Sequence, residues 1–317
     1  MDLKKPLVII SGATGVGKTE LSISLAKLIG GEIISADSMQ VYKGFDIGTA
    51  KITEQEMKGI PHHLIDILEP DRQFNIYEFK KYTLEAINKI ISNGHVPIIV
   101  GGTGFYIQSV IYDVRFEDED TDKSYRCELE ELAARNGAEF LHEMLEKVDP
   151  EAAAEIHPNN VKRVIRALEY YHENGEKISV HNKREGERTS PYNFAYFVLN
   201  RDRSVIYRRI NERVDKMVEM GLIGEVKTLL ESGISPKWQS MQGIGYKEIV
   251  PFIYGQTTRE EAVELIKQNT RHFAKRQNTW FKREKDAIWM NYEDYDSTDS
   301  MIDKILEILR EKGIANV

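Results

Sequence analysis

The feature that most constrains the fold is the glycine-rich segment GATGVGKT, residues 12–19, which directly follows the apolar run LVII, residues 7–10. The segment satisfies the pattern G-x-x-x-x-G-K-[ST], whose backbone N–H groups surround a phosphate. This arrangement needs a buried strand before the loop and a helix after it, because the helix N-terminus adds partial positive charge at the anion. Leu21, Leu25 and Leu28 follow at helical spacing. The segment therefore predicts a strand, a phosphate-binding loop (P-loop) and a helix in succession.

Two side chains of the P-loop have expected roles of their own. Lys18 can place its ammonium against a phosphate oxygen, and the Thr19 hydroxyl can hold Mg²⁺. The alternative, a glycine-rich turn without a ligand, is disfavoured because strand, helix, lysine and threonine all stand in the required order. The motif predicts binding of a diphosphate or triphosphate but does not say what carries it. The predicted phosphate-binding residues are Gly12, Ala13, Thr14, Gly15, Val16, Gly17, Lys18 and Thr19.

Apolar periodicity along the rest of the chain predicts an α/β fold. Short apolar runs at residues 33–34, 96–102, 194–199 and 287–290 are typical of buried strands, and residues 75–92 show an amphipathic helical pattern. Strands that alternate with helices indicate a parallel sheet with helices on both faces. We expect a core like that of the P-loop nucleotide kinases.

A change of character after Tyr112 predicts an insertion. The segment that follows is acidic and turn-like, residues 123 to about 175 are rich in Ala, Glu, Leu and Arg and predict helices, and the polar residues 175–191 predict a mobile loop. The expected organisation is a P-loop core formed by residues 1–114 and 191–317, with an inserted helical domain at residues 115–190.

Composition narrows the functional classes. The 317 residues are 41% hydrophobic, which is typical of a globular protein with one large domain or two moderate ones. No apolar run reaches the ~20 residues of a membrane span, and the single cysteine, Cys127, excludes a disulfide framework. We therefore expect a cytoplasmic protein. The net charge of −8 argues against a general nucleic-acid binder, although a local basic groove stays open.

The acidic residue expected near the phosphate is Asp37. A GTPase would carry an N-K-x-D motif after a strand, and the strand at residues 96–102 ends in glycines and not in an acid. Asp37 instead follows the second strand, near the sheet edge where ligands bind in such folds. The alternative for an isolated Asp–Ser pair is a turn or a helix N-cap.

Several separate blocks resemble one family. GATGVGKT is followed in order by DSMQVYKGFDIGTAK, PHHLID, VGGTGFY, KRVIRALE, GIGYKE and RHFAKRQNTWFKR. The order and the spread from about residue 7 to 290 resemble the tRNA dimethylallyltransferases, also called tRNA isopentenyltransferases. The P-loop departs from the pattern of many members, which have Pro after the first Gly and an Ala–Ser pair before the last. No Cys/His extension follows residue 290, so the chain resembles the compact bacterial form.

The resemblance implies a reaction and a set of catalytic residues. Members move a dimethylallyl group from dimethylallyl diphosphate to the N6 amine of the adenosine 3′ of the anticodon, in tRNAs that read codons beginning with U. The P-loop would then hold the diphosphate leaving group, with Mg²⁺ on Thr19. By the same resemblance Asp37 is the general base, Arg213 clamps the diphosphate and Thr103 contacts the tRNA near the reacting atoms. Without the resemblance, Arg213 would be an exposed helix arginine and Thr103 a helix N-cap.

Besides Thr103, contacts with the tRNA anticodon stem-loop are expected in four regions. Residues 37–40 match the segment that reads the base, and residues 275–282 match a helix that contacts tRNA. A second basic block lies at residues 162–166. One further residue, Arg126, matches a position of the family that contacts tRNA. From the residues alone, the basic side chains could equally form a solvated helix face. The predicted tRNA-binding residues are Asp37, Ser38, Met39, Gln40, Thr103, Arg126, Lys162, Arg163, Arg166, Lys275, Arg276 and Gln277.

Two other functions stay open, and some residues have structural interpretations. A small-molecule adenylate isopentenyltransferase would share the P-loop, and so would an RNA-binding ATPase without transferase activity. The inserted helices and the AKRQNTWF block favour tRNA, and we expect a monomer. His62 and His63 are expected to pack or hydrogen-bond, the acidic residues 117–120 to form a solvated hinge, and Cys127 to be partly buried.

Overall fold

The computed structural model describes residues 4–114, 124–186 and 189–315. The chain divides into two compact units, residues 1–111 with 191–317 and residues 112–190. We call them the sheet unit and the helical unit. The acidic run at residues 117–120 lies outside the described residues.

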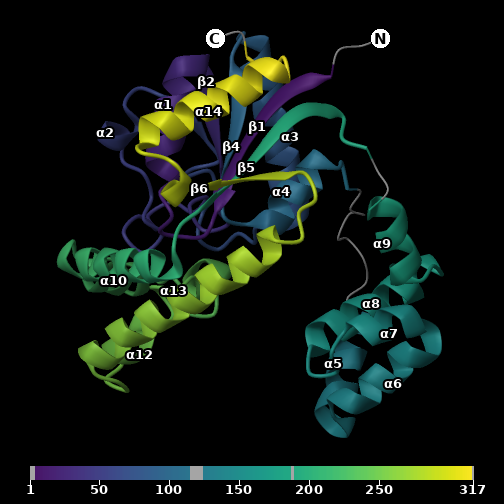
Figure 1. The fold of residues 1–317 in the computed structure, drawn as a ribbon. Coiled ribbons are helices and arrows are strands. Elements are labelled where there is room, and N and C mark those ends of the chain that lie inside the picture. Colours follow the sequence, from purple (N-terminus) through teal and green to yellow (C-terminus); the bar gives the residue numbers. More distant parts are fainter. Residues whose placement is uncertain (1–3, 115–123, 187–188, 316–317) are drawn as a thin grey trace. The chain divides into compact units, whose positions relative to one another are not determined.

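The sheet unit is built on a parallel sheet, as predicted. Its six described strands have the order β3-β2-β4-β1-β5-β6 (Figure 1). Because every strand pair is parallel, the carboxyl ends of the strands meet at one edge. The strands are β1 (Lys5–Gly12), β2 (Gly31–Ala36), β3 (His62–His63), β4 (Val96–Gly101), β5 (Tyr192–Asn200) and β6 (Ala287–Asn291).

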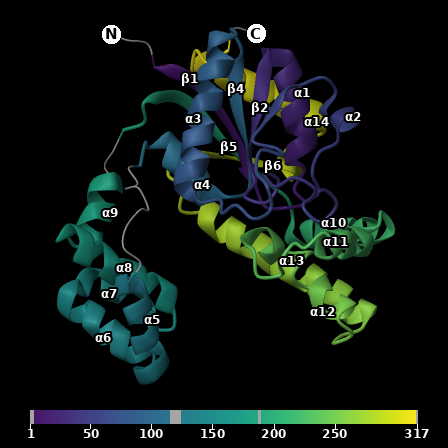
Figure 2. The same cartoon turned by 180° about the vertical axis from the view of Figure 1, so that it is seen from behind.

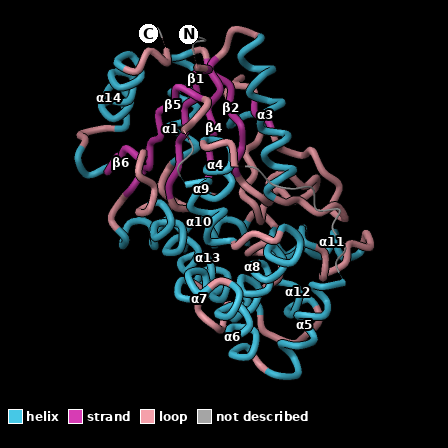
Figure 3. Tube along the Cα trace, turned by 90° about the vertical axis from the view of Figure 1, so that its right-hand side faces the viewer, coloured by secondary structure: helices cyan, strands magenta, loops and turns pink. Residues whose placement is uncertain are grey.

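Helices cover both faces of the sheet. Alternate residues such as Val8 and Ile10 face α1 (Lys18–Ile29) and α14 (Thr298–Glu311), with which they form one buried apolar cluster. The opposite face carries α3 (Ile76–Ser92), as Figure 2 shows from behind, and in Figure 3 α14 and α3 lie on opposite sides of the strands. The helix predicted at residues 75–92 is confirmed, and it begins with a capping box between Asn75 and Glu78.

Helices α4 (Gly104–Ile111), α10 (Arg203–Glu219) and α13 (Arg259–Phe281) lie at the edge of the sheet where the strands end (Figure 1). A small apolar cluster of Ala13, Ile206, Ile210 and Ala274 joins the P-loop to α10 and α13, so these two helices form one wall of the edge. Helix α4 starts directly after β4. Further bounds are α2 (Glu54–Met57), α11 (Leu222–Glu231) and α12 (Ile249–Ile253), with 3₁₀ turns at Gln239–Gln242 and Tyr292–Asp294.

The helical unit contains only helices among its described residues, around a core that includes Leu129, Leu141, Leu145, Val164 and Leu168. The elements are α5 (Ser124–Asn136), α6 (Ala138–Val148), α7 (Pro150–Glu155), α8 (Val161–Asn174) and α9 (Ile178–Gly186).

Two expectations for the helical unit were wrong. Residues 175–191 were predicted to form a loop, yet α9 occupies residues 178–186. The helix is held by long-range bonds, since Asp149 accepts hydrogen bonds from the backbone N and the Oγ of Ser179 at 2.9 and 2.7 Å. The polar composition of residues 178–186 is therefore compatible with a helix, and it does not indicate a loop. Cys127 is exposed, not partly buried.

None of the helices in the described part of the chain has both the length and the apolar character that a membrane span requires.

Candidate functional site

The ends of β1, β2 and β4 surround a cavity of about 840 Å³ within the sheet unit. The P-loop, the turn after Asp37 and the turn after β4 all contribute to its wall, as do α10 and α13. The structure thus brings together most of the residues that the sequence predicted for this unit. Those that line the cavity are Thr14, Gly15, Gly17, Lys18, Thr19, Asp37, Ser38, Met39, Gln40, Thr103, Arg213, Arg276 and Gln277.

Glycine is required at two P-loop positions. Gly12 has a φ of +143°, and a Cβ there would lie 2.5 Å from the carbonyl oxygen of Leu199. Gly17 has a φ of +112° and is the N-cap of α1. The side chains of Ala13 and Val16 are fully buried and pack inside the protein; phosphate binding by the backbone of these residues stays a prediction.

Lys18 lies folded across the P-loop. Its Nζ donates to the carbonyl oxygens of Gly12 and Ala13 at 2.8 and 3.0 Å. Burial, and after it the positive charge of Arg213, lower the pKa of Lys18 to about 8, and the carboxylate of Asp37 acts in the opposite direction. The ammonium is therefore a poorly solvated cation that an anion in the cavity would stabilise.

Arginines from α10 and from the end of β5 hold the P-loop. Arg213 donates from Nη1 to Oγ1 of Thr14 at 3.4 Å, and burial lowers the pKa of its guanidinium against the opposing charge of Asp37. Arg209, one turn earlier, donates from Nε to the carbonyl of Gly15 at 2.8 Å. Arg209 was not predicted from the sequence, although its spacing of four from Arg213 places both on one helix face.

A third arginine was also missed. Arg201 donates from Nε to the carbonyl of Val16 at 3.0 Å, and its guanidinium lies 3.4 Å from the ring centroid of Tyr292. No local sequence signal marks it, because its partner is 185 residues away.

Asp37 lies directly after β2, and its Oδ1 accepts a hydrogen bond from the backbone N of Met39 at 2.9 Å. Asp37 is therefore both a turn residue, which was the alternative expectation, and part of the cavity wall. Gln40 follows this turn and is half-buried at the cavity wall. Its Oε1 accepts from Oγ of Ser35 at 3.0 Å, and its Nε2 donates to the carbonyl of Thr49 at 3.3 Å.

Gln277 ties three elements together. Its Oε1 accepts from the backbone N of Thr14 at 2.9 Å, and its Nε2 donates to the carbonyl of Gly102 at 3.0 Å. Only 7% of the residue is exposed, and a Cβ at Gly102 would lie 2.0 Å from its Nε2. The structure gives Gln277 an internal role, which differs from the tRNA contact expected of it; that contact stays a prediction. Thr103 follows in the same turn, just before α4.

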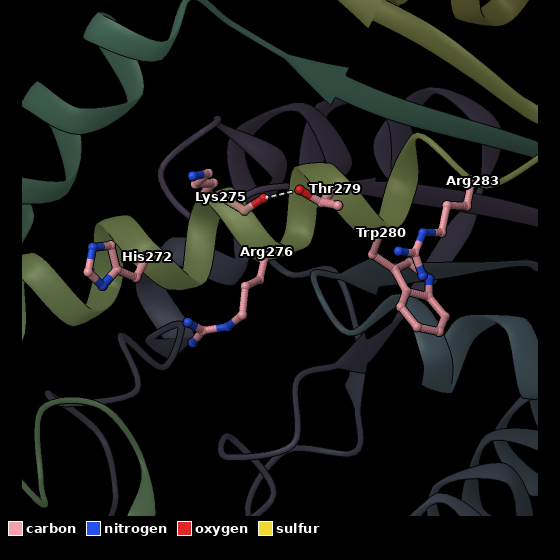
Figure 4. A pocket seen from close by; sticks show the side chains of 6 residues that line it. All are labelled: His272, Lys275, Arg276, Thr279, Trp280 and Arg283. Carbon is pink, nitrogen blue, oxygen red and sulfur yellow. Dashed lines mark hydrogen bonds between the residues drawn. The ribbon is translucent and has the colours of Figure 1, made fainter. Parts of the chain in front are cut away.

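The basic face of α13 borders a second, more open hollow of about 440 Å³ (Figure 4). Arg276 and Trp280 project from the same side of the helix, whereas Lys275 points away from them. Trp280 donates from Nε1 to Glu284 at 3.0 Å, and burial raises the pKa of that carboxyl to about 6. The residues around the hollow are His272, Lys275, Arg276, Thr279, Trp280 and Arg283.

The predicted tRNA-binding residues of the helical unit differ in their environment. Lys162, Arg163 and Arg166 are exposed on α8. Arg126 forms two hydrogen bonds of 2.7 Å with the buried carboxylate of Glu169, and its side chain stays 42% exposed. Glu169 therefore pairs with Arg126 and does not offset the charge of the exposed basic residues on α8.

The cavity offers few ligands for a metal. The described residues contain no group of three or more His, Cys, Asp or Glu side chains that could hold one. The Thr19 hydroxyl and the Asp37 carboxylate line the wall. Mg²⁺ suits such a set, because it keeps several waters and commonly uses one or two protein ligands together with phosphate oxygens.

Comparison with known proteins shows the family. The IPP transferase model matches residues 40–284. The tRNA dimethylallyltransferase of Lachnoclostridium phytofermentans is 56% identical over 98% of this chain and 99% of its own, and that of Geobacillus thermodenitrificans is 49% identical over 98% of both.

Solved structures agree with these relatives. The full-length tRNA isopentenylpyrophosphate transferase of Bacillus halodurans is 46% identical over 98% of both chains, with a TM-score of 0.74. A eukaryotic dimethylallyltransferase acting on tRNA is 30% identical, with a TM-score of 0.82 over 98% of this chain and 79% of its own. The resemblance seen in the sequence blocks is therefore confirmed, and the chain belongs to the IPP transferase family.

Proposed function

We propose that this chain transfers a dimethylallyl group from dimethylallyl diphosphate to the N6 amine of the adenosine 3′ of the anticodon, in tRNAs that read codons beginning with U. The observation that carries the proposal is the convergence of Lys18, Arg213 and Asp37 on one cavity. Two cations for a leaving diphosphate and one carboxylate for a proton are the groups that this transfer needs.

The P-loop is proposed to bind the diphosphate and to stabilise it as it leaves. The bond between C1 of the allyl group and the diphosphate oxygen breaks, and negative charge develops on that oxygen. Backbone N–H groups at the start of α1, the Lys18 ammonium and the Arg213 guanidinium are all positioned before the reaction, so little reorganisation is needed. The arginine fork adds bidentate contacts to phosphate oxygens.

Thr19 is the protein residue proposed to hold Mg²⁺, with diphosphate oxygens and water as the other ligands. When bound, the ion would further neutralise the charge that develops on the leaving diphosphate.

Asp37 is proposed to be the general base. The N6 nitrogen is a poor nucleophile because its lone pair is delocalised into the ring. As N6 bonds to C1 of the allyl group, one N6 proton passes to the Asp37 carboxylate, which balances the charge on the new amine. The hydrogen bond from Met39 holds Oδ1 of this carboxylate in place.

The tRNA is proposed to bind basic residues of both units. The exposed Lys162, Arg163 and Arg166 of α8 and the Lys275 and Arg276 of α13 suit contacts with phosphates of the anticodon stem-loop. The target base must leave its stack to reach the cavity, and residues 37–40 are proposed to read it there.

The test is an incubation of labelled dimethylallyl diphosphate with unmodified tRNA, AMP and ATP in parallel. Label in tRNA supports the proposal. Label in AMP alone indicates a small-molecule isopentenyltransferase, and ATP hydrolysis without prenyl transfer indicates an ATPase.

A further inference from the structure

One carboxylate of the sheet unit accepts four hydrogen bonds away from the P-loop. Glu225 of α11 receives the backbone N–H groups of Asp46 and Ile47 on Oε2 at 3.1 and 2.7 Å. Its Oε1 receives the N–H of Gly48 at 3.1 Å and the hydroxyl of Tyr246 at 2.6 Å. Three successive amides and one phenol thus share both oxygens of a single side chain. We call this arrangement the Glu225 clasp.

Tyr246 packs its ring against Gly48 and donates its hydroxyl to Glu225, so it belongs to the clasp. It is fully buried, and a Cβ added at Gly48 would lie 2.5 Å from its ring. Its ring centroid lies 4.8 Å from that of Phe45. Burial and the neighbouring Glu225 carboxylate raise the pKa of Tyr246, so its hydroxyl stays protonated and continues to donate. The clasp therefore fixes the orientation of the backbone N–H groups of residues 46–48 and the distance between this backbone and the Tyr246 ring.

The clasp is connected to the proposed acceptor side of the cavity. Gln40 donates from Nε2 to the carbonyls of Thr49 and Ala50 at 3.3 and 3.4 Å. Gln40 directly follows the turn that Asp37 and Met39 close, and Gly48, Thr49, Ala50 and Asp37 all line the cavity. A continuous set of contacts thus runs from Glu225 through residues 46–50 and Gln40 to the turn of the proposed base.

The proposed diphosphate side is held by different residues. Gln277, Arg201 and Arg209 bond to the P-loop, and none of the hydrogen bonds of the Glu225 clasp reaches it. The two sides of the cavity therefore have separate supports.

From these contacts we propose that Glu225, with Tyr246, is a positioning residue for the acceptor nucleoside. The clasp holds residues 46–50 and the turn at residues 37–40 in the arrangement that receives the adenosine, and it leaves binding of the allylic diphosphate to the P-loop. The proposal rests on the proposed function. It goes further because it assigns each side of the cavity to its own set of residues: the Glu225 clasp supports the part that receives the adenosine, and Gln277, Arg201 and Arg209 support the P-loop.

The test compares Glu225→Gln with Glu231→Gln. The first replaces one accepting oxygen by an NH₂ group that faces the donors. The second removes an exposed charge on the same helix, whose ion pair with Lys227 spans 3.7 Å. Steady-state kinetics give kcat and KM for tRNA, equilibrium binding gives Kd for dimethylallyl diphosphate, and urea unfolding gives stability.

We expect Glu225→Gln to lower kcat/KM for tRNA by about 10- to 100-fold, the range for lost hydrogen bonds to a charged group. Its Kd for dimethylallyl diphosphate should stay within about twofold, and Glu231→Gln should match the parent protein in every measurement. Tyr246→Phe keeps the ring and removes one donor, so a smaller loss of about three- to tenfold on the tRNA side alone is expected.

Two results overturn the inference. One is an unchanged kcat/KM for tRNA in Glu225→Gln; the other is an equal loss for both substrates, which indicates general destabilisation. Should Glu225→Gln fail to fold, the same two criteria apply to Tyr246→Phe. If the parent protein itself places no label in tRNA, the proposed function fails and the acceptor role falls with it.

Discussion

The lowered pKa of Lys18 predicts that dimethylallyl diphosphate binds more weakly as the pH rises through about 8. Burial and the charge of Arg213 bring the pKa down to about 8. Below this value the ammonium is present for the diphosphate, and above it the neutral amine is the main form. Because a bound diphosphate stabilises the ammonium, binding above pH 8 takes up a proton, and the affinity must fall with rising pH.

The size of the effect follows from the protonated fraction. With a pKa of about 8, that fraction falls from about 0.9 at pH 7 to about 0.1 at pH 9. If only the protonated form binds, the apparent Kd rises by the same ratio, which is about tenfold. The phosphate groups of the ligand add no comparable change, because they are already ionised over most of this range.

The assay is equilibrium dialysis of labelled dimethylallyl diphosphate at constant ionic strength between pH 7 and 9. The control is Lys18→Met, which should bind more weakly at pH 7 and show little dependence on pH. A parent protein whose Kd is flat from pH 7 to 9 contradicts the reasoning. So does a Lys18→Met variant that keeps the full tenfold change, since another group would then be titrating.

Three further variants test other parts of the site. Asp37→Ala should keep tRNA affinity within a few-fold and lower kcat by about 10²–10⁴-fold, the usual size of general-base catalysis, so an unchanged single-turnover rate would remove it as the base. Gln277→Leu should lower the free energy of unfolding by about 2–4 kcal/mol, because it leaves the amide of Thr14 and the carbonyl of Gly102 without their partner; urea titration measures this, and a loss below 0.5 kcal/mol would count against the bridge. Arg166→Glu should raise KM for tRNA and flatten its dependence on salt without changing kcat, and an identical salt slope would place α8 outside the tRNA contact.

The P-loop could be predicted from the sequence because its physics is local. The strand, the glycines with unusual φ angles, Lys18 and the start of α1 lie within 15 consecutive residues. The parallel sheet could also be predicted, since fully buried strands are short apolar runs and their alternation with helices leaves few topologies. The two-residue strand β3 was missed because it is too short to show any periodicity.

The supports of the cavity were decided by the tertiary structure alone. Gln277 reaches Thr14 across 263 residues, Arg209 reaches Gly15 across 194, and Glu225 reaches Asp46 across 179. Each uses an ordinary polar residue on a helix, where the sequence pattern is equally typical of a solvated face. Such bonds form with backbone groups that have no partner at the edge of the folded sheet. Which groups these are is defined only when distant segments of the chain pack together.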